Sequence, residues 1–174
     1  GFDLIADVTG NLLKQDVLMV VLGTGDPEYE ALFRDFQAAY PEKLGLKIVY
    51  SNPLAHKIEA GADIFLMPSH YEPCGLNQIY SLKYGTVPVV RANCGLDDTI
   101  EQWDPETEKG TGFKFARYSS LELWNTLQEA LQAFKDQASW RKLMKNGLSK
   151  DFSWQRESKE YVKVYERAIK LRRR

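Results

Sequence analysis

The sequence predicts an α/β protein built on a doubly wound parallel sheet of Rossmann type. Short apolar runs suited to buried strands alternate four times with segments whose apolar residues recur at helical spacing. The distance from one strand to the next matches βαβ crossovers, which favour parallel strands with helices on both faces. Because the 174 residues contain no internal repeat and no linker-like stretch, we expect a single domain over residues 1–174.

The first half of the chain holds most of this alternation. Apolar residues at helical spacing predict an opening helix in residues 2–13. Asp26 is expected to cap the next helix, with Pro27 at its first position. The remaining predicted elements of this half are, in order, a strand at 17–22, a turn at 23–27, a strand at 46–50, a helix from Pro53, a strand at 64–67, a helix that opens at Gly75 and a strand at 87–90.

The second half is expected to be mostly helical. Its predicted elements are a surface loop at 102–109, a short strand at 111–115 and helices at 119–134, 137–150 and 155–170. The last helix carries Tyr161, Tyr165 and Ile169 on one stripe. This is a wide apolar face for a terminal element, so we expect another domain to cover it.

Composition and charge narrow the classes of function. The net charge of −1 shows no excess of positive charge of the kind that nucleic-acid-binding proteins carry. We interpret the basic tail, made of Lys170, Arg172, Arg173 and Arg174, as a frayed, solvated end rather than a membrane or partner site. No apolar run approaches membrane length, and the chain has no signal-like start. The two cysteines form no CxxC pair and only two histidines are present, which argues against a zinc site or a disulfide framework and favours a reducing compartment.

The loop at residues 68–78 is the strongest candidate for a ligand site. It joins a predicted strand to a predicted helix, and ligands of open α/β sheets bind at the carboxyl ends of the strands. Gly75 would let an anion approach the free N–H groups of Leu76 and Asn77 at the start of the helix. Glu72, three residues earlier, is well placed for a sugar hydroxyl, whereas Cys74 is interpreted as a small packed residue rather than a nucleophile.

Gly23, Tyr50 and His56 are weaker candidates for the same crevice. Gly23 begins a GxG turn that does not continue as a dinucleotide fingerprint, and no Walker-type loop is present. The turn either lines a nucleotide crevice or is only a turn, and Tyr50 either stacks on a base or packs. His56 is expected to be structural or hydrogen-bonded in the crevice wall, because neither histidine is accompanied by other residues that could bind a metal ion with it.

Several motifs together resemble the bacterial glycogen synthases and plant starch synthases. The motifs are Gly61-Ala62-Asp63, Pro68-Ser69, Glu72-Pro73-Cys74-Gly75-Leu76-Asn77-Gln78, Lys83-Tyr84-Gly85-Thr86-Val87-Pro88-Val89-Val90-Arg91, Gly95-Leu96-Asp97-Asp98-Thr99, Gly112-Phe113 and Phe152-Ser153-Trp154. The resemblance covers essentially the whole chain and implies the C-terminal half of a two-domain glycosyltransferase. It implies transfer of glucose from ADP-glucose to the non-reducing end of an α-1,4-glucan, with retention of configuration and without a metal or other cofactor.

The resemblance also implies roles for individual residues. Glu72 matches the carboxylate that holds the donor glucose near its reacting carbon. Gly75 and Leu76 match the backbone donors to the diphosphate, with Asn77 adjoining, and Tyr50 matches the aromatic residue that stacks on adenine. Cys74 has no catalytic role in that pattern, so it counts with Gly23 and His56 only as a candidate substrate-binding residue.

The same resemblance implies that the chain is an excised piece of a longer enzyme. The family has an arginine and a lysine that clamp the diphosphate just before the position of Gly1, and an N-terminal half that binds the glucan acceptor. We therefore expect the isolated chain to be inactive, the helix at 155–171 to pack on the missing domain, and the enzyme to be cytoplasmic in a bacterium or plastidial in a plant. A UDP-sugar transferase of the same fold and a non-catalytic nucleotide- or glucan-binding module remain alternatives.

Overall fold

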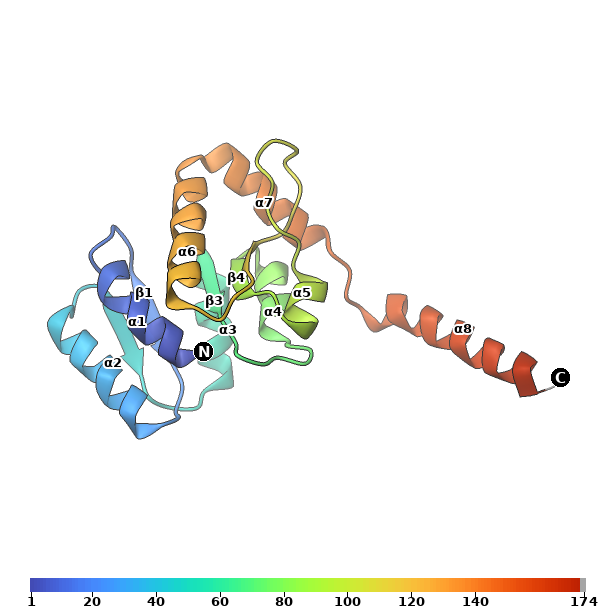
Figure 1. The fold of residues 1–174 in the computed structure, drawn as a ribbon, viewed down its shortest axis with the longest axis horizontal. Helices are drawn as coiled ribbons and strands as arrows, with labels where there is room; N and C mark the ends of the chain where they lie inside the picture. Colours follow the sequence, from blue (N-terminus) through green and yellow to red (C-terminus); the bar gives the residue numbers. More distant parts are fainter. Residues whose placement is uncertain (173–174) are drawn as a thin grey trace.

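The strands are all paired in parallel, but they form two sheets rather than one. In the computed structural model, which describes residues 1–172, β1 (Met19–Leu22) pairs with β2 (Leu44–Lys47). The second sheet has the order β3-β4-β5, formed by β3 (Ile64–Met67), β4 (Val87–Arg91) and β5 (Phe113–Phe115). The predicted α/β class with parallel strands is confirmed, and the two sheets lie side by side with helices around them (Figure 1).

Eight helices are present in the described part of the chain. They are α1 (Phe2–Leu12), α2 (Pro27–Ala39), α3 (Asn52–Gly61), α4 (Asn77–Tyr84), α5 (Cys94–Thr99), α6 (Ser120–Lys135), α7 (Gln137–Ser149) and α8 (Trp154–Arg172). The predicted cap of α2 is confirmed, since the Asp26 carboxylate accepts a hydrogen bond from the Glu28 N–H at 3.2 Å and Pro27 occupies the first turn. Arg173 and Arg174 of the basic tail lie outside the described residues.

The core of the three-stranded sheet is built on alternating faces of β4. Val87 and Val89 point into the cluster formed with α1 and α6, whereas Val90 points into the cluster that contains Leu82 of α4 and Leu96 of α5. Successive side chains of a strand face opposite sides, so a fully buried apolar strand indicates cover on both faces. Burial of each such side chain contributes about 1.5–3 kcal/mol.

Helix α1 connects the two sheets. Leu4 and Val8 on α1 belong to the core of the three-stranded sheet. Leu13, directly after the helix, packs with Phe33 and Leu44 against the two-stranded sheet. The amphipathic stripe predicted at the start of the chain therefore holds both halves of the domain together.

Two predicted boundaries that bear on the candidate site were wrong, and one helix was missed. The second strand ends at Lys47, so Tyr50 lies in the following loop instead of ending a strand. Helix α4 begins at Asn77 rather than Gly75, because Gly75 has a φ of +72° and a right-handed helix cannot include that conformation. The six-residue helix α5 was not predicted, because so short a segment shows little periodicity.

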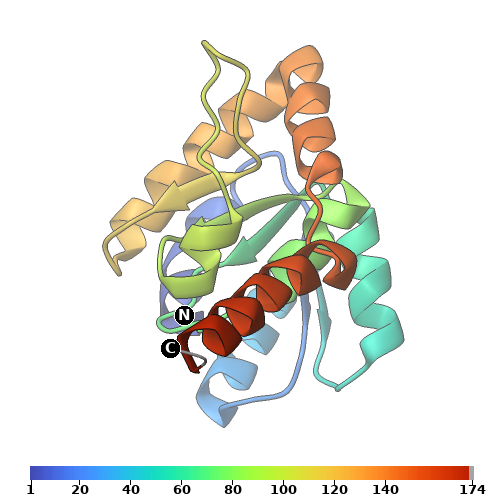
Figure 2. The same cartoon turned by 90° about the vertical axis from the view of Figure 1, so that its right-hand side faces the viewer.

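The terminal helix α8 stands apart from the rest of the structure. It extends well clear of the other elements in Figure 1, and in Figure 2, viewed from that side, it lies in front of them. None of its residues is buried, and its apolar side chains, including Tyr165 and Ile169, are more than half exposed. A search of residues 1–172 for a helix long and apolar enough to span a membrane finds none.

Candidate functional site

The loop between β3 and α4 is shaped by Gly75 and by the buried side chain of Gln78. A Cβ atom at Gly75 would lie 2.4 Å from Gln78 Oε1, in addition to the strain of the positive φ. The Gln78 side chain is fully buried, and its Nε2 donates to the carbonyl oxygens of Cys74 at 2.9 Å and Gly75 at 3.2 Å. The loop is thus held in place by the side-chain amide of Gln78, which lies in the first turn of α4.

The start of α4 presents unpaired N–H groups. Its N-cap residue, Leu76, makes no side-chain capping bond. Within residues 1–172, no oxygen accepts a hydrogen bond from the N–H groups of Gly75, Leu76 or Asn77. Such groups carry the positive end of the helix dipole, so an anion bound there would gain hydrogen bonds and a favourable field. The amides that the sequence predicted to be free are free in the structure.

Glu72 is fixed by its backbone, through Asn93 on the neighbouring loop. The Glu72 N–H donates to Asn93 Oδ1 at 3.0 Å, and Asn93 Nδ2 donates to the Ser69 carbonyl at 2.9 Å. The half-buried Glu72 side chain takes part in no ion pair within the described residues. A carboxylate held in this way beside open amides could accept hydrogen bonds from hydroxyl groups of a ligand that also carries an anion.

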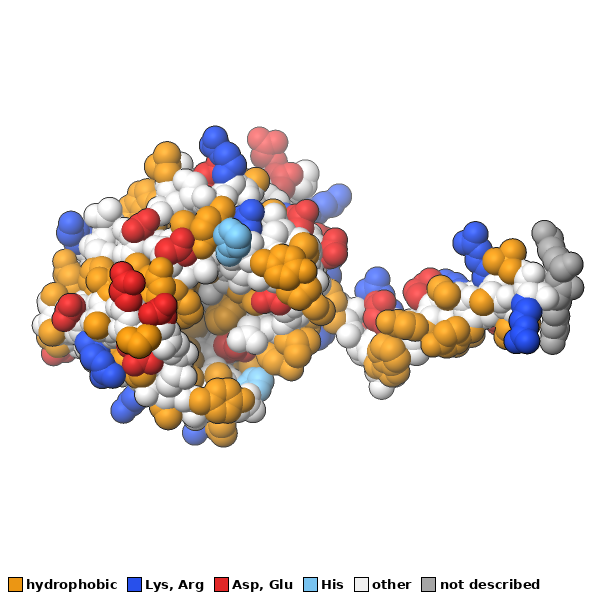
Figure 3. Space-filling view, turned by 60° about the horizontal axis from the view of Figure 1, so that its bottom comes forward, with side chains coloured by type: hydrophobic (Ala, Val, Ile, Leu, Met, Phe, Trp, Pro, Cys, Tyr) orange, Lys and Arg blue, Asp and Glu red, His pale blue; other side chains and the backbone are white. Residues whose placement is uncertain are grey.

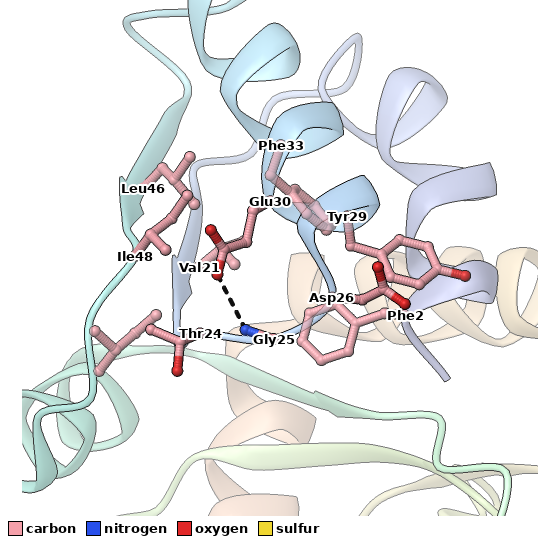
Figure 4. A pocket seen from close by; sticks show the side chains of 12 residues that line it. Phe2, Val21, Thr24, Gly25, Asp26, Tyr29, Glu30, Phe33, Leu46 and Ile48 are labelled. Carbon is pink, nitrogen blue, oxygen red and sulfur yellow. Dashed lines mark hydrogen bonds between the residues drawn. The ribbon is translucent and has the colours of Figure 1, made fainter.

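A hollow of about 80 Å³ lies beside Gly23, at the carboxyl end of β1. Apolar side chains from both strands and from α2 line it, together with the backbone of residues 23–25 (Figure 4). The turn is braced because the Gly25 N–H donates to Glu30 Oε1 at 3.1 Å (Figure 4). Gly23 also donates its N–H to the Lys47 carbonyl at 3.1 Å, which closes the pairing of β1 with β2. The structure therefore makes this turn part of a cavity wall.

Tyr50 and His56 lie before and on α3. Tyr50 is 84% exposed, so its ring is not packed in a core and is available to a ligand. The His56 ring lies 5.2 Å from the ring of Tyr80, and its Nδ1 is 3.2 Å from the Tyr84 hydroxyl. His56 is thus hydrogen-bonded against α4, as one of the two sequence interpretations expected.

The expectation that Cys74 is a packed residue was wrong. Its side chain is exposed, as is that of Cys94. The packing at this point is made by backbone instead, since the chain at Gly95 lies directly against the main chain of Cys74. Within residues 1–172, no group of three or more histidine, cysteine or acidic side chains is placed to hold a metal ion.

A polar group near the same edge was not found from the sequence. The Tyr118 hydroxyl donates to Asp3 Oδ1 at 2.5 Å, and the Arg91 guanidinium lies 5.3 Å from the centre of the Tyr118 ring. Arg91 also donates to the His70 carbonyl at 2.7 Å. Burial and the bond to Asp3 raise the pKa of Tyr118 to about 12, and the same bond lowers the pKa of Asp3. Asp3 and Tyr118 are too far apart in the chain for any local pattern to pair them.

These parts meet at one edge of the molecule. Gly23, Tyr50 and the loop with Glu72 and Gly75 follow the carboxyl ends of β1, β2 and β3. Figure 3 shows this face, which is recessed between the two halves of the body. Parallel strands, helices on both faces and a loop with open amides at this edge define the Rossmann-like α/β class, whose members bind ligands at the carboxyl ends of the strands.

Comparison with known proteins identifies the family. The family model for glycosyl transferases group 1 matches residues 1–147. The chain therefore belongs to the group 1 glycosyl transferases. It is 58% identical over 172 residues to the glycogen synthase of Koribacter versatilis, covering 99% of this chain and 36% of that protein. It is 49% identical over 170 residues to the glycogen synthase of Thermotoga maritima, covering 97% of this chain and 35% of that protein.

A solved structure gives the same picture. The catalytic domain of starch synthase IV from Arabidopsis thaliana, bound to ADP and acarbose, superposes with a TM-score of 0.85 at 28% identity, covering 97% of this chain and 36% of that chain. The predicted resemblance to glycogen and starch synthases, and the predicted C-terminal Rossmann-like fold, are confirmed. The chain spans just over a third of the length of the curated relatives that it matches.

Proposed function

We propose that this chain is the donor-binding domain of a glycogen or starch synthase. The enzyme would transfer glucose from ADP-glucose to the non-reducing end of an α-1,4-glucan, with retention of configuration. The observation that carries the proposal is the left-handed Gly75, three residues after Glu72. Among residues 1–172, no acceptor bonds to the amides that follow it at the start of α4. The relatives' names and the ADP bound to the starch synthase support this assignment.

Each part of the site has a task in the proposed reaction. The diphosphate accepts hydrogen bonds from the N–H groups of Gly75 and Leu76, where the helix dipole favours negative charge. Glu72 accepts hydrogen bonds from the glucose hydroxyls and holds the anomeric carbon in place. Tyr50, which is 84% exposed, stacks on the adenine. As the bond to the anomeric carbon breaks, negative charge moves to the leaving phosphate, so protein cations rather than a metal would stabilise it.

We also propose that the 174-residue chain does not catalyse glucosyl transfer by itself. A helix N-terminus contributes only about 0.3–2 kcal/mol to the binding of an anion. Loss of one preorganised donor to developing charge costs roughly 3–4 kcal/mol of barrier. The family resemblance places an arginine, a lysine and the glucan site outside these residues. Donor binding without transfer is therefore the expected behaviour of this chain.

Titration calorimetry with ADP, ADP-glucose and UDP-glucose tests the proposal. We expect binding of both adenine ligands and weaker binding of UDP-glucose; a clear preference for UDP-glucose would replace the proposal with a UDP-sugar transferase. Glu72→Gln should weaken ADP-glucose roughly tenfold, the value of about one charge-assisted hydrogen bond, and leave ADP nearly unchanged. Glu106→Gln, on an exposed loop, is the matched control. If none of the three ligands binds, the donor-domain assignment is wrong.

A further inference from the structure

Two exposed thiols lie on segments whose backbones touch beside the candidate anion site. Cys74 directly precedes Gly75, and Cys94 is the first residue of α5. A Cβ atom added at Gly95 would lie 2.5 Å from the Cα and 2.3 Å from the carbonyl oxygen of Cys74. Only a glycine fits there, so the residue next to Cys94 is pressed against the main chain of Cys74.

This contact places the two cysteines within reach of each other. Gly95 Cα can be no farther from Cys74 Cα than its added Cβ atom plus one bond, and consecutive Cα atoms are about 3.8 Å apart. The Cα atoms of Cys74 and Cys94 are therefore separated by roughly 8 Å at most, by this chain geometry. Disulfides span about 4.4–6.8 Å between Cα atoms, so the two Cα atoms would have to approach each other by about 1 Å at most.

Side-chain bonds hold the two segments in this position. Asn93, immediately before Cys94, bonds to the Glu72 N–H and the Ser69 carbonyl. From the other side, Gln78 Nε2 donates to both the Cys74 carbonyl and Thr99 Oγ1, at 2.9 and 3.2 Å. Cys94 also has a φ of +39°, a conformation that costs energy for any residue with a Cβ. A cysteine stands at this position although a glycine would fit its backbone better.

We propose that Cys74 and Cys94 form a reversible intramolecular disulfide when the protein is exposed to hydrogen peroxide. One thiolate attacks a peroxide oxygen of hydrogen peroxide, giving a sulfenic acid and, after protonation, water. The second thiol attacks that sulfur and displaces the hydroxyl as a second water. Two thiols and one peroxide thus become one disulfide and two waters, and an external dithiol restores the reduced form. The crosslink joins the loop before Gly75 to α5 and, on the proposed function, places a redox switch beside the donor diphosphate.

Peptide mapping by mass spectrometry tests the crosslink in the 174-residue chain after graded peroxide treatment. We expect one species that lacks two hydrogen atoms, with the Cys74 and Cys94 peptides linked, and full recovery with dithiothreitol. The linked form should melt roughly 5–10 °C higher, because the bond closes a loop of about twenty residues in the unfolded chain. Independent oxidation of both thiols to sulfinic acids, or crosslinking only between molecules, would overturn the proposal.

Cys94 variants and added ADP distinguish the crosslink proposal from the donor-site proposal. Cys94→Gly suits the left-handed φ, so it should fold at least as well as the parent, form no intramolecular crosslink and show no shift in melting temperature with peroxide. Cys94→Ser keeps the backbone strain and should respond to peroxide as Cys94→Gly does. A peroxide-dependent shift in melting temperature that persists in both variants would refute the Cys74–Cys94 disulfide. Saturating ADP should slow crosslinking several-fold by covering Cys74. Crosslinking at an unchanged rate would support the dithiol and count against the proposed diphosphate position.

Discussion

The position of Gly75 imposes two constraints that only a glycine satisfies without strain. Its φ of +72° is strained for a side chain, and a Cβ atom there would meet the Gln78 amide that braces the loop. We predict that Gly75→Ala lowers the stability by about 2 kcal/mol, mostly through the backbone strain, which corresponds to roughly 4–8 °C in melting temperature. Displacement of the open amides should also weaken ADP binding at least tenfold, measurable by calorimetry.

A matched glycine isolates the effect of that conformation. Gly61 at the end of α3 is exposed, and a Cβ atom there meets no atom within 4 Å. Gly61→Ala should therefore change neither the melting temperature by more than a degree or so nor the affinity for ADP. If the two variants behave alike, Gly75 is an ordinary turn residue and the proposed anion site has lost its basis.

The Tyr118–Asp3 bond predicts a pH-dependent contribution to stability. Asp3 has a lowered pKa, so the bond stabilises the folded chain above the ordinary Asp pKa and is lost as the pH falls through the lowered value. Tyr118 has a pKa raised to about 12, so its contribution is fully present below pH 10 and is lost only as the pH rises toward 12. The bond should therefore contribute across the neutral range.

Tyr118→Phe removes this hydrogen bond and leaves the ring in place. At pH 7 we expect a loss of about 1 kcal/mol, or roughly 2–4 °C in melting temperature. At pH 2.5 the difference from the parent should shrink, because protonation of Asp3 weakens the bond in the parent as well. Tyr161→Phe on the exposed helix α8 is the control. A loss of equal size at both pH values would contradict the pairing.

Residue types and their spacing predicted part of this site. Glu72 and Gly75 could be singled out because a strand, a glycine and a helix follow one another directly. Gln78 and Asn93 were missed as braces, because only the folded loop places their amides under carbonyl groups of another segment. Cys74 was misjudged for a similar reason: its main chain packs tightly while its side chain faces solvent.

At the scale of elements, the length of the neighbouring strand determines where the second predicted strand ends. The run from Leu46 to Tyr50 is apolar enough to continue as a strand. It stops at Lys47 because the partner strand ends at Leu22, and the chain turns away at Gly23. A strand needs a neighbour for its backbone groups, so its length is a property of the sheet and not of one segment. Tyr50 was displaced into a loop by this effect.

Helix α8 is predicted to contribute nothing to the stability of the rest of the domain. It has no buried residue and contacts no other element extensively, whereas Phe152 before it still packs on the core. A chain that ends at Ser153 should keep its melting temperature within about 1 °C and lose only helical signal in circular dichroism. A fall of several degrees would show that α8 docks on the body in solution. The expectation that α8 packs on a further domain stays a prediction, to be tested in a longer protein.

At the scale of the whole molecule, the two sheets are arranged like a doubly wound sheet with one position open. The classic strand order 3-2-1-4-5-6 places two strands on one side of the first strand and three on the other. Here β2-β1 and β3-β4-β5 occupy those two sides, and β1 and β3 each leave one edge without a partner in the described chain. All four residues of β3 are only half-buried, although β4 beside it is almost fully buried. The alternation in the sequence predicted the class but could not show this opening, because it requires the strand order.

The contacts of the first residues indicate how the open position would be filled. The backbone of Gly1 lies against the carbonyl of Pro68 at the end of β3, since a Cβ atom there would come within 2.3 Å of that oxygen. A strand leading into α1 would thus end beside β3, and its right-handed crossover through α1 would place it next to β1. We predict that an apolar strand added before Gly1, for example the residues that precede the matching glycine in the Koribacter relative, pairs with both edges.

Hydrogen–deuterium exchange checks this pairing directly. The extended chain should protect amides of β1 and β3 that exchange quickly in the 174-residue chain, and its melting temperature should rise by several degrees, because two strand edges and their half-buried side chains lose contact with water. A glycine–serine extension of equal length is the control and should protect neither strand. If the apolar extension also leaves both edges unprotected, the separation of the two sheets is a fixed feature of the fold.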